Sequence, residues 1–320
     1  MTSRTMALMS GYQALVCDLD GVVYLGASAV PHAVESLTGL GVPIQYATNN
    51  ASRPPASVAE HLGSLGLACA DADVATSAQA GAGLLRDALA PGSVVLAVGG
   101  PGVGIALEEA GLRPVTPGDR AGHLDGVLQG YGAAVTASDL GEAAYAIQGG
   151  AIWVATNTDA TLPTDRGVAP GNGSLVAAVQ RACGRPPDAV AGKPEAPLYL
   201  LCAQRLERAP ADVLAVGDRL DTDIEGAVAA GMDSLLVLTG VDDLRACATA
   251  PLRRRPTFVA PDLRALHESP EAGRGSGQSL RALWDAVSAC WAACDSDSGD
   301  AQVARALAEA EDVLAALRRR

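Results

Sequence analysis

Short apolar runs alternate with segments of helical periodicity along most of the chain. The run ALVCDL at residues 14–19 leads to the helical pattern AVESLTGL at 33–40, and the run PIQYAT at 43–48 leads to SVAEHLGSLGL at 57–67. This order of strand and helix is typical of a doubly wound sheet of parallel strands. The same alternation returns between residues 198 and 240. We therefore predict an α/β fold whose sheet is built from the first and last thirds of the chain.

The middle of the chain carries strands and helices of its own, enough for a small α/β domain inserted into the sheet-forming part. The Gly, Ser and Pro content of SPEAGRGSGQS is typical of a flexible linker, which should separate the C-terminal residues from the sheet. The predicted parts are a Rossmann-like core at residues 10–80 and 185–268, the inserted domain at 81–184, the linker at 269–279 and a tail at 280–320.

The tail has the periodicity of two amphipathic helices, since apolar residues recur at three- and four-residue steps in each half. These residues are Leu280, Leu283, Trp284, Val287 and Trp291, then Val303, Leu307, Ala310, Leu314 and Leu317. We predict a short helical hairpin. Its apolar stripes should pack against each other or against a second copy of the chain, as a homodimer.

Composition and net charge limit the classes of molecule that the protein is expected to bind. The 320 residues include 23 Lys and Arg against 36 Asp and Glu, a formal net charge of −13. Such a field repels nucleic acids and anionic membrane surfaces, so we expect neither as a partner. The sequence has no signal-peptide pattern and no apolar stretch of about 18 residues, and its seven cysteines are scattered. These features predict a cytoplasmic protein.

Four separated segments place polar residues where a predicted strand ends or a helix begins. They are DLDGV at 18–22, ATNN at 47–50, AGKPE at 191–195 and GDRLDTD at 217–223. The carboxyl ends of parallel strands share one crevice, so these segments are expected to meet. Asp-x-Asp after a strand is by itself most often a solvated loop, and GKPE lacks the other residues of a Walker loop. The four segments indicate a functional site only in combination.

The first segment raises a question of charge. Residues two apart in a strand face the same side, so Asp18 and Asp20 should lie side by side and repel each other. A bound cation or a shared proton would compensate the repulsion. Asp18 and Asp218, with Asp223 as a further candidate, offer the hard oxygen ligands that Mg²⁺ prefers.

The remaining segments supply groups suited to an anion. Lys193 carries a compact positive charge, and the Thr48 hydroxyl and the Asn49 backbone N–H can donate to phosphate oxygens. A metal, a lysine and donors around one anion indicate phosphoryl transfer, with a carboxylate as nucleophile.

In these motifs the chain resembles phosphatases of the haloacid dehalogenase superfamily, in the NagD-type or 4-nitrophenylphosphatase-like subfamily. The resemblance covers residues 12–268 and rests on DLDGVVY, TNNASR, TSAQA, GKPE and VGDRLDTDIEGAVAAGM, in that order. It implies that the insert is a type-2 cap domain. It also implies Mg²⁺-dependent hydrolysis of a small phosphorylated metabolite through an aspartyl-phosphate.

The resemblance also implies roles for single residues. Asp18 is the nucleophile, and Asp20 is the general acid and then the general base. Mg²⁺ is held by Asp18, the Asp20 backbone carbonyl and Asp218, while Asp223 orders its waters. The residues that bind the phosphoryl group are Thr48, Asn49 and Lys193, with Gly21 permitting the tight turn beside them.

The four segments contact only the phosphate and the metal, so we expect residues of the cap domain to select the substrate. Asn157 and Asp159 either face the substrate or cap a turn, and the small residues around them offer no aromatic platform for a ring. The alanine-rich composition and appended tail most resemble actinobacterial glycerol 3-phosphate phosphatases. We therefore expect glycerol 3-phosphate first, 2-phosphoglycolate second and pyridoxal 5′-phosphate third. The alternatives are a phosphomutase or a hydrolase of another bond on the same fold, or a non-enzymatic metabolite sensor or scaffold that uses the tail.

Overall fold

The chain is described by a computed structural model and divides into two compact units. The first unit comprises Met1–Tyr46, Gly63–Ala68 and Cys202–Arg320, and the second comprises Ala47–Leu62 and Cys69–Leu201. The residues that the structure describes are 6–119, 122–164, 166–272, 278–296 and 300–319.

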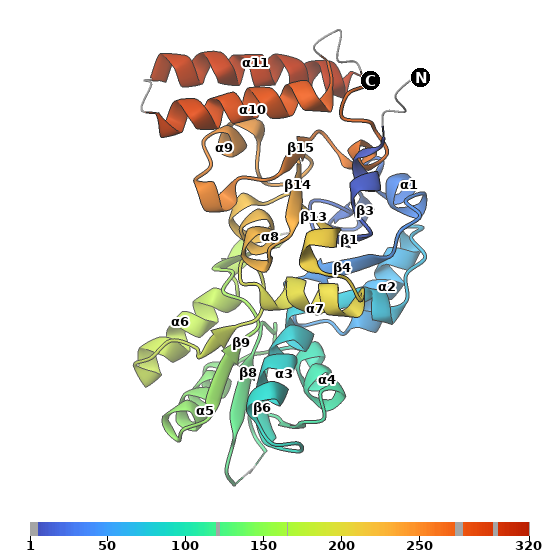
Figure 1. Ribbon diagram of the computed structural model, residues 1–320. Helices are drawn as coiled ribbons and strands as arrows, with labels where there is room; N and C mark the ends of the chain where they lie inside the picture. Colours follow the sequence, from blue (N-terminus) through green and yellow to red (C-terminus); the bar gives the residue numbers. More distant parts are fainter. Residues whose placement is uncertain (1–5, 120–121, 165, 273–277, 297–299, 320) are drawn as a thin grey trace. The chain divides into compact units, whose positions relative to one another are not determined.

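One six-stranded sheet contains strands from the first and the last third of the chain (Figure 1). Its strand order is β15 (Phe258–Ala260), β14 (Asp233–Val237), β13 (Val213–Gly217), β1 (Ala14–Cys17), β4 (Ile44–Thr48) and β5 (Val74–Thr76). All pairs from β15 to β4 are parallel. The direct pairing of β1 with β13 confirms that the first and last thirds of the chain build one doubly wound sheet.

The central strands are apolar because both their faces are covered. Every residue of β1 and of β13 is buried, which is the pattern of a parallel sheet with helices on its two faces. The helices of the chain are α1 (Ala33–Thr38), α2 (Pro55–Ser64), α3 (Ser77–Ala88), α4 (Pro101–Glu109), α5 (Ala137–Gln148), α6 (Asn172–Cys183), α7 (Pro197–Arg205), α8 (Glu225–Ala230), α9 (Leu244–Ala248), α10 (Leu280–Asp295) and α11 (Asp300–Arg318).

The second unit has its own sheet, as the alternation in the middle of the chain predicts. The strand order is β12 (Ala189–Val190), β9 (Ile152–Ala155), β8 (Gly126–Gln129), β6 (Val94–Val98) and β7 (Arg113–Val115), all parallel. Trp153 is fully buried in its core and donates its Nε1–H to Gln129 Oε1 at 3.1 Å. A hairpin of β10 (Thr161–Thr164) and β11 (Gly167–Pro170) precedes α6. This unit is wider than residues 81–184, and the finer domain boundaries stay a prediction.

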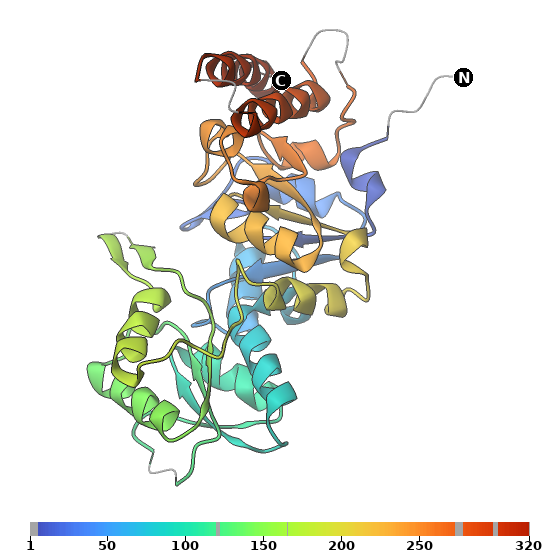
Figure 2. The same ribbon diagram turned by 60° about the vertical axis from the view of Figure 1, so that its left-hand side comes forward.

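The tail is the predicted helical hairpin, formed by α10 and α11 (Figure 2). The two helices pack against each other as expected, but α10 also packs on α9 and β15. Trp284 donates its Nε1–H to the Val259 carbonyl at 2.7 Å, and Trp291 donates to the Cys247 carbonyl at the same distance. The expectation that the linker separates the tail from the sheet is therefore wrong. Residues 273–277 of the predicted linker lie outside the described residues.

Candidate active site

Asp18 lies where β1 gives way to a loop. Its backbone N–H still donates to the Val216 carbonyl of β13 at 2.9 Å, so the residue is fixed at the carboxyl end of the sheet. The side chain is buried, at 8% exposure. A carboxylate at this depth needs a compensating partner, because removal from water disfavours its charged form.

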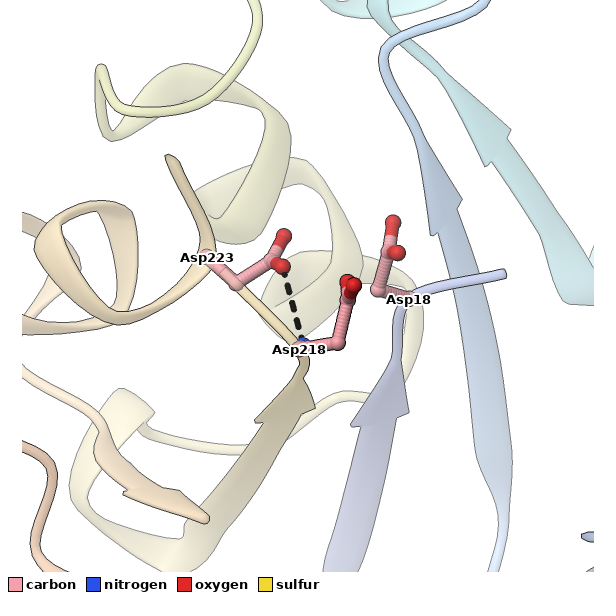
Figure 3. Close-up of side chains that lie close together, drawn as sticks. All are labelled: Asp18, Asp218 and Asp223. Carbon is pink, nitrogen blue, oxygen red and sulfur yellow. Dashed lines mark hydrogen bonds between the residues drawn. The ribbon is translucent and has the colours of Figure 1, made fainter. Parts of the chain in front are cut away.

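Three carboxylates meet at this point of the first unit. Asp18, Asp218 and Asp223 are all buried, and one oxygen from each lies within 4.8 Å of the others (Figure 3). Three negative charges this close in a buried site repel strongly unless a cation or protons balance them. All the donors are hard oxygens, which is the chemistry of a Mg²⁺ site. The residues therefore fit the predicted metal.

The short π-helix η4 (Leu220–Ile224) orients Asp223. Its carboxylate Oδ2 accepts the backbone N–H of Asp218 at 3.2 Å and that of Arg219 at 3.0 Å. Gly217 leaves the space for this packing, since a Cβ there would lie 2.1 Å from the Asp223 Cβ. Asp223 is thus tied to the loop that carries Asp218.

Asp20 lies outside the carboxylate cluster. The strand ends at Cys17, so strand alternation does not extend to Asp20, which is exposed in the turn after the strand. Gly21 shapes this turn with a positive φ of 83°, and its N–H donates to the Tyr24 carbonyl at 2.9 Å. A Cβ at Gly21 would lie 2.3 Å from Asp218 Oδ2. Glycine is required here both for backbone conformation and for space.

The predicted phosphate-binding residues belong to the second unit. Thr48 is the last residue of β4 and is buried, and its Oγ1 accepts the Asn50 N–H at 3.1 Å. Lys193 is also buried, at 3% exposure, and its Nζ donates to the Ala47 carbonyl at 3.4 Å. A buried ammonium group favours an anionic ligand, because burial removes most of its hydration.

Asn49 connects these segments through its side chain. Its Oδ1 accepts the Lys193 backbone N–H at 2.8 Å, and its Nδ2 donates to the Lys193 carbonyl at 2.9 Å. The Asn49 carbonyl accepts the Ser77 hydroxyl at 2.7 Å. Gly192 must lack a side chain, since a Cβ would lie 2.5 Å from Asn49 Oδ1. The amide of Asn49 therefore fixes the backbone from which Lys193 projects.

Asn157 and Asp159 are joined to the same network. Asn157 Oδ1 accepts the Asp159 N–H at 3.1 Å, which is the turn-capping bond named among the alternatives. The Asn157 Nδ2 donates to the Asn49 carbonyl at 2.7 Å, and the Asp159 carboxylate accepts from Asn49 Nδ2 at 3.2 Å. Any direct role of these two residues in substrate choice stays a prediction.

Several residues that shape the site were not predicted from the sequence. Ser77 binds the Asn49 carbonyl, and Thr239 binds the carbonyl of Gly21 at 2.7 Å. Thr239 and Gly240 come shortly after β14, so they occupy the same kind of strand-end position as the four recognised segments. Their position just after a predicted strand was the sequence feature that could have identified them.

In the described part of the chain, no helix has both the length and the apolar character required to cross a membrane.

A buried carboxylate cluster at the carboxyl end of a parallel sheet defines an α/β protein suited to bind a divalent cation. Comparison with known proteins specifies the class. A family model described as haloacid dehalogenase-like hydrolase matches residues 15–113, and a related hydrolase model matches residues 190–266. The chain belongs to the haloacid dehalogenase-like hydrolase family.

Individual relatives agree with this assignment. The D-glycerol 3-phosphate phosphatase of Mycobacterium tuberculosis is 48% identical over 257 residues, covering 80% of this chain and 71% of that protein. The acid sugar phosphatase of Staphylococcus aureus is 36% identical over 239 residues, covering 74% and 90%. A crystal structure of the M. tuberculosis glycerol phosphate phosphatase in complex with magnesium matches with a TM-score of 0.78 and 47% identity, covering 82% of this chain and 79% of that one.

Proposed function

We propose that the protein is a Mg²⁺-dependent phosphatase that hydrolyses a small phosphate monoester, with glycerol 3-phosphate as the first candidate. The observation that carries the proposal is the buried cluster of Asp18, Asp218 and Asp223, whose oxygens lie within 4.8 Å of one another. Family membership and the named relatives support the same reaction class.

The proposed metal ligands are the carboxylates of Asp18 and Asp218 and the backbone carbonyl of Asp20, with Asp223 ordering the outer coordination. When bound, Mg²⁺ balances the clustered negative charge and the charge of the phosphate oxygens. This role explains why three buried carboxylates can stay ionised together.

In the first half-reaction, we propose that a carboxylate oxygen of Asp18 attacks phosphorus. A new O–P bond forms as the bond from phosphorus to the ester oxygen breaks, leaving an aspartyl-phosphate. Asp20, protonated at this stage, gives its proton to the departing alkoxide. Its exposed position in a turn next to the nucleophile suits a group that must reach the leaving group.

The second half-reaction reverses the role of Asp20. Its carboxylate takes a proton from a water molecule, whose oxygen attacks the phosphorus of the aspartyl-phosphate. The bond from phosphorus to the Asp18 oxygen then breaks, releasing inorganic phosphate and restoring the Asp18 carboxylate. Asp20 is again protonated and ready for the next cycle.

We propose that Thr48, Asn49 and Lys193 bind the phosphoryl group that is transferred. The Lys193 ammonium would supply the compact charge and the Thr48 hydroxyl a hydrogen bond. The Asn49 side chain is engaged with the Lys193 backbone. We therefore propose that Asn49 binds the phosphoryl group through its backbone N–H, while its side chain holds Lys193 in position.

Glycerol 3-phosphate is proposed as substrate on the strength of the relative that is 48% identical. The test is phosphate release from glycerol 3-phosphate, 2-phosphoglycolate and pyridoxal 5′-phosphate, each with Mg²⁺, reported as kcat/KM. Asp18→Asn is the matched control, because it keeps the size of the side chain and removes the nucleophile. A highest kcat/KM for glycerol 3-phosphate would support the assignment, and a clear preference for another compound would replace it.

The same assay separates the alternatives. A sensor or scaffold would bind a phosphorylated metabolite without releasing phosphate, and a phosphomutase would move the phosphoryl group to another carbon of the product. The proposed cytoplasmic location and the homodimer stay predictions.

A further inference from the structure

A short stretch beyond β14 contacts both loops that carry the clustered aspartates. We call this stretch, the four residues from Thr239 to Asp242, the TGVD segment. None of its side chains belongs to the carboxylate cluster. Its contacts all lie within the first unit of the chain.

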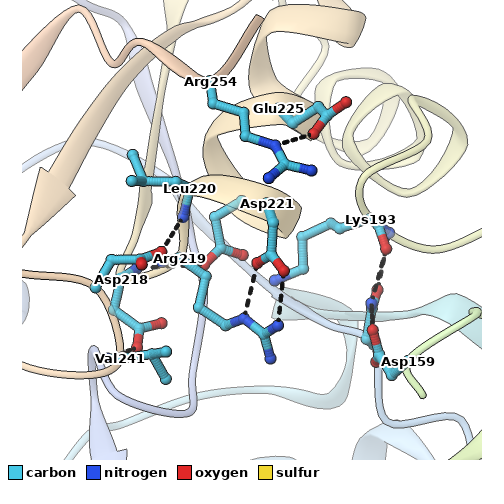
Figure 4. A network of polar contacts seen from close by, with 12 residues as sticks. Asp159, Lys193, Asp218, Arg219, Leu220, Asp221, Glu225, Val241 and Arg254 are labelled. Carbon is cyan, nitrogen blue, oxygen red and sulfur yellow. Dashed lines mark hydrogen bonds and ion pairs between the residues drawn. The ribbon is translucent and has the colours of Figure 1, made fainter. Parts of the chain in front are cut away.

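The first group of contacts fixes Asp218. The Val241 backbone N–H donates to Asp218 Oδ2 at 2.7 Å (Figure 4), and the Asp242 N–H donates to the Asp218 carbonyl at 3.1 Å. The segment therefore holds both the carboxylate and the backbone of the same residue. Hydrogen bonds from backbone N–H groups to a carboxylate are charge-assisted and directional.

Gly240 adds a steric constraint on the same carboxylate. A Cβ at this position would lie 1.9 Å from Asp218 Oδ2 and 2.5 Å from its Cγ. Gly240 is not among the glycines with positive φ, so its backbone conformation is open to any residue. Glycine is needed here for space alone. With Gly21 also packed against Asp218 Oδ2, the carboxylate lies between two bare Cα atoms.

The segment also holds the two neighbouring loops. Thr239 Oγ1 donates to the Gly21 carbonyl at 2.7 Å, in the turn after Asp18. Asp242 Oδ2 accepts the Leu220 N–H at 2.7 Å, where the π-helix η4 that carries Asp223 begins. One short segment thus contacts Asp218 directly and, through the side chains of Thr239 and Asp242, the loops that carry the other two clustered aspartates.

We propose that the TGVD segment is the positioning element of the metal site. Thr239 sets the loop after Asp18, while Gly240 and Val241 set the orientation of the Asp218 carboxylate. This inference rests on the proposed function in so far as the three carboxylates bind Mg²⁺. Outer partners that orient metal ligands typically change metal affinity by about 10- to 100-fold when they are removed.

The test measures Mg²⁺ binding without substrate, by titration calorimetry on the purified full chain. In Gly240→Ala the new methyl group displaces the Asp218 carboxylate, and we expect Mg²⁺ affinity to fall about 10- to 100-fold. Thr239→Val keeps the shape and loses the hydroxyl donor, so a fall of roughly 10-fold is expected. Thr239→Ser, which restores the hydroxyl, should recover the affinity.

Gly63→Ala is the matched control. Gly63 lies in α2, and a Cβ there meets no atom within 4 Å, so Mg²⁺ affinity should stay at the wild-type value. A second readout is rescue: if the segment positions the metal ligands, raising Mg²⁺ should restore much of the lost turnover in Thr239→Val. A defect in folding alone would not respond to Mg²⁺ in this way.

Two results would overturn the proposal. One is Mg²⁺ affinity within twofold of wild type in both Gly240→Ala and Thr239→Val. The other is equal loss in Thr239→Val and Thr239→Ser, which would exclude the hydroxyl as the cause. If Gly240→Ala fails to fold, the two Thr239 variants decide the outcome. A wild-type chain that binds no Mg²⁺ would instead reject the metal-dependent function itself, together with this inference.

Discussion

Replacing Trp284 tests whether the tail is part of the core. Trp284 lies on α10 and is 7% exposed. Its ring packs against that of Phe258 of β15, with the centroids 4.6 Å apart and the planes tilted by 45°. Its Nε1–H donates to the Val259 carbonyl at 2.7 Å. Because β15 is the edge strand of the six-stranded sheet, α10 covers an edge that would otherwise be open to other chains.

The expected loss follows from these contacts. Trp284→Ala removes a nearly buried ring and leaves a cavity, which typically costs about 3–5 kcal/mol in the free energy of unfolding. For a unit of this size, that corresponds to a fall in Tm of about 6–20 °C. Trp284→Phe keeps most of the ring but removes the N–H donor from a buried carbonyl, at a cost of about 1–3 kcal/mol. The order of stability should therefore be wild type, then Phe, then Ala.

The measurement is thermal unfolding followed by circular dichroism, with Leu252→Ala as a control. Leu252 is 78% exposed, and replacing it should change the free energy of unfolding by less than about 0.5 kcal/mol. Well below Tm, Trp284→Ala should still release phosphate, because Trp284 contacts none of the clustered aspartates. A Tm for Trp284→Ala equal to that of the control would show that the tail contributes nothing to core stability. The reasoning from the edge strand would then be wrong.

The other predictions concern catalysis. Asp18→Asn should abolish phosphate release, and near-native turnover would exclude the covalent route. Asp20→Asn should slow turnover roughly 10²- to 10⁴-fold, and the pH profile of this variant should lose the dependence on the Asp20 carboxyl group. Chelation should remove activity and Mg²⁺ restore it, whereas Ca²⁺ should inhibit because its looser coordination misplaces the attacking oxygen; full activity in excess chelator would contradict this. Asn49→Ala removes two hydrogen bonds to the Lys193 backbone and should lower kcat/KM about tenfold or more; kinetics unchanged from wild type would show that Lys193 is positioned without it.

The sheet and the carboxylate cluster could be predicted because both depend on general properties of parallel sheets. Apolar runs fully buried on two faces leave a clear pattern, as in β1 and β13. Strand ends converge whatever their separation in sequence, so Asp18 and Asp218 could be placed together from position alone. Strand alternation cannot carry the placement of Asp20 beside Asp18, because the strand ends at Cys17 and the sequence does not show where the ladder ends. That placement stays a prediction.

The contacts of the TGVD segment with Asp218 could not be predicted because they use groups that give no side-chain pattern in the sequence. A backbone N–H from Val241 and a missing Cβ at Gly240 fix Asp218, and neither appears as a chemical side-chain pattern. The tail shows a related limit. Its apolar stripe indicates that one face is buried, but the partner depends on which surface lies within reach, and here that surface includes the edge strand β15.

The polar residues of the second unit that invite a specificity role are largely engaged in holding loops together. Asn172 is 2% exposed and donates to the Asn157 carbonyl at 2.8 Å, while Asn157 donates to the Asn49 carbonyl. These bonds fix the loops after β4 and β9, and in the described part of the chain Asn172 Oδ1 is buried without a hydrogen-bond partner. The preference for glycerol 3-phosphate over pyridoxal 5′-phosphate rests on similarity to the mycobacterial relative.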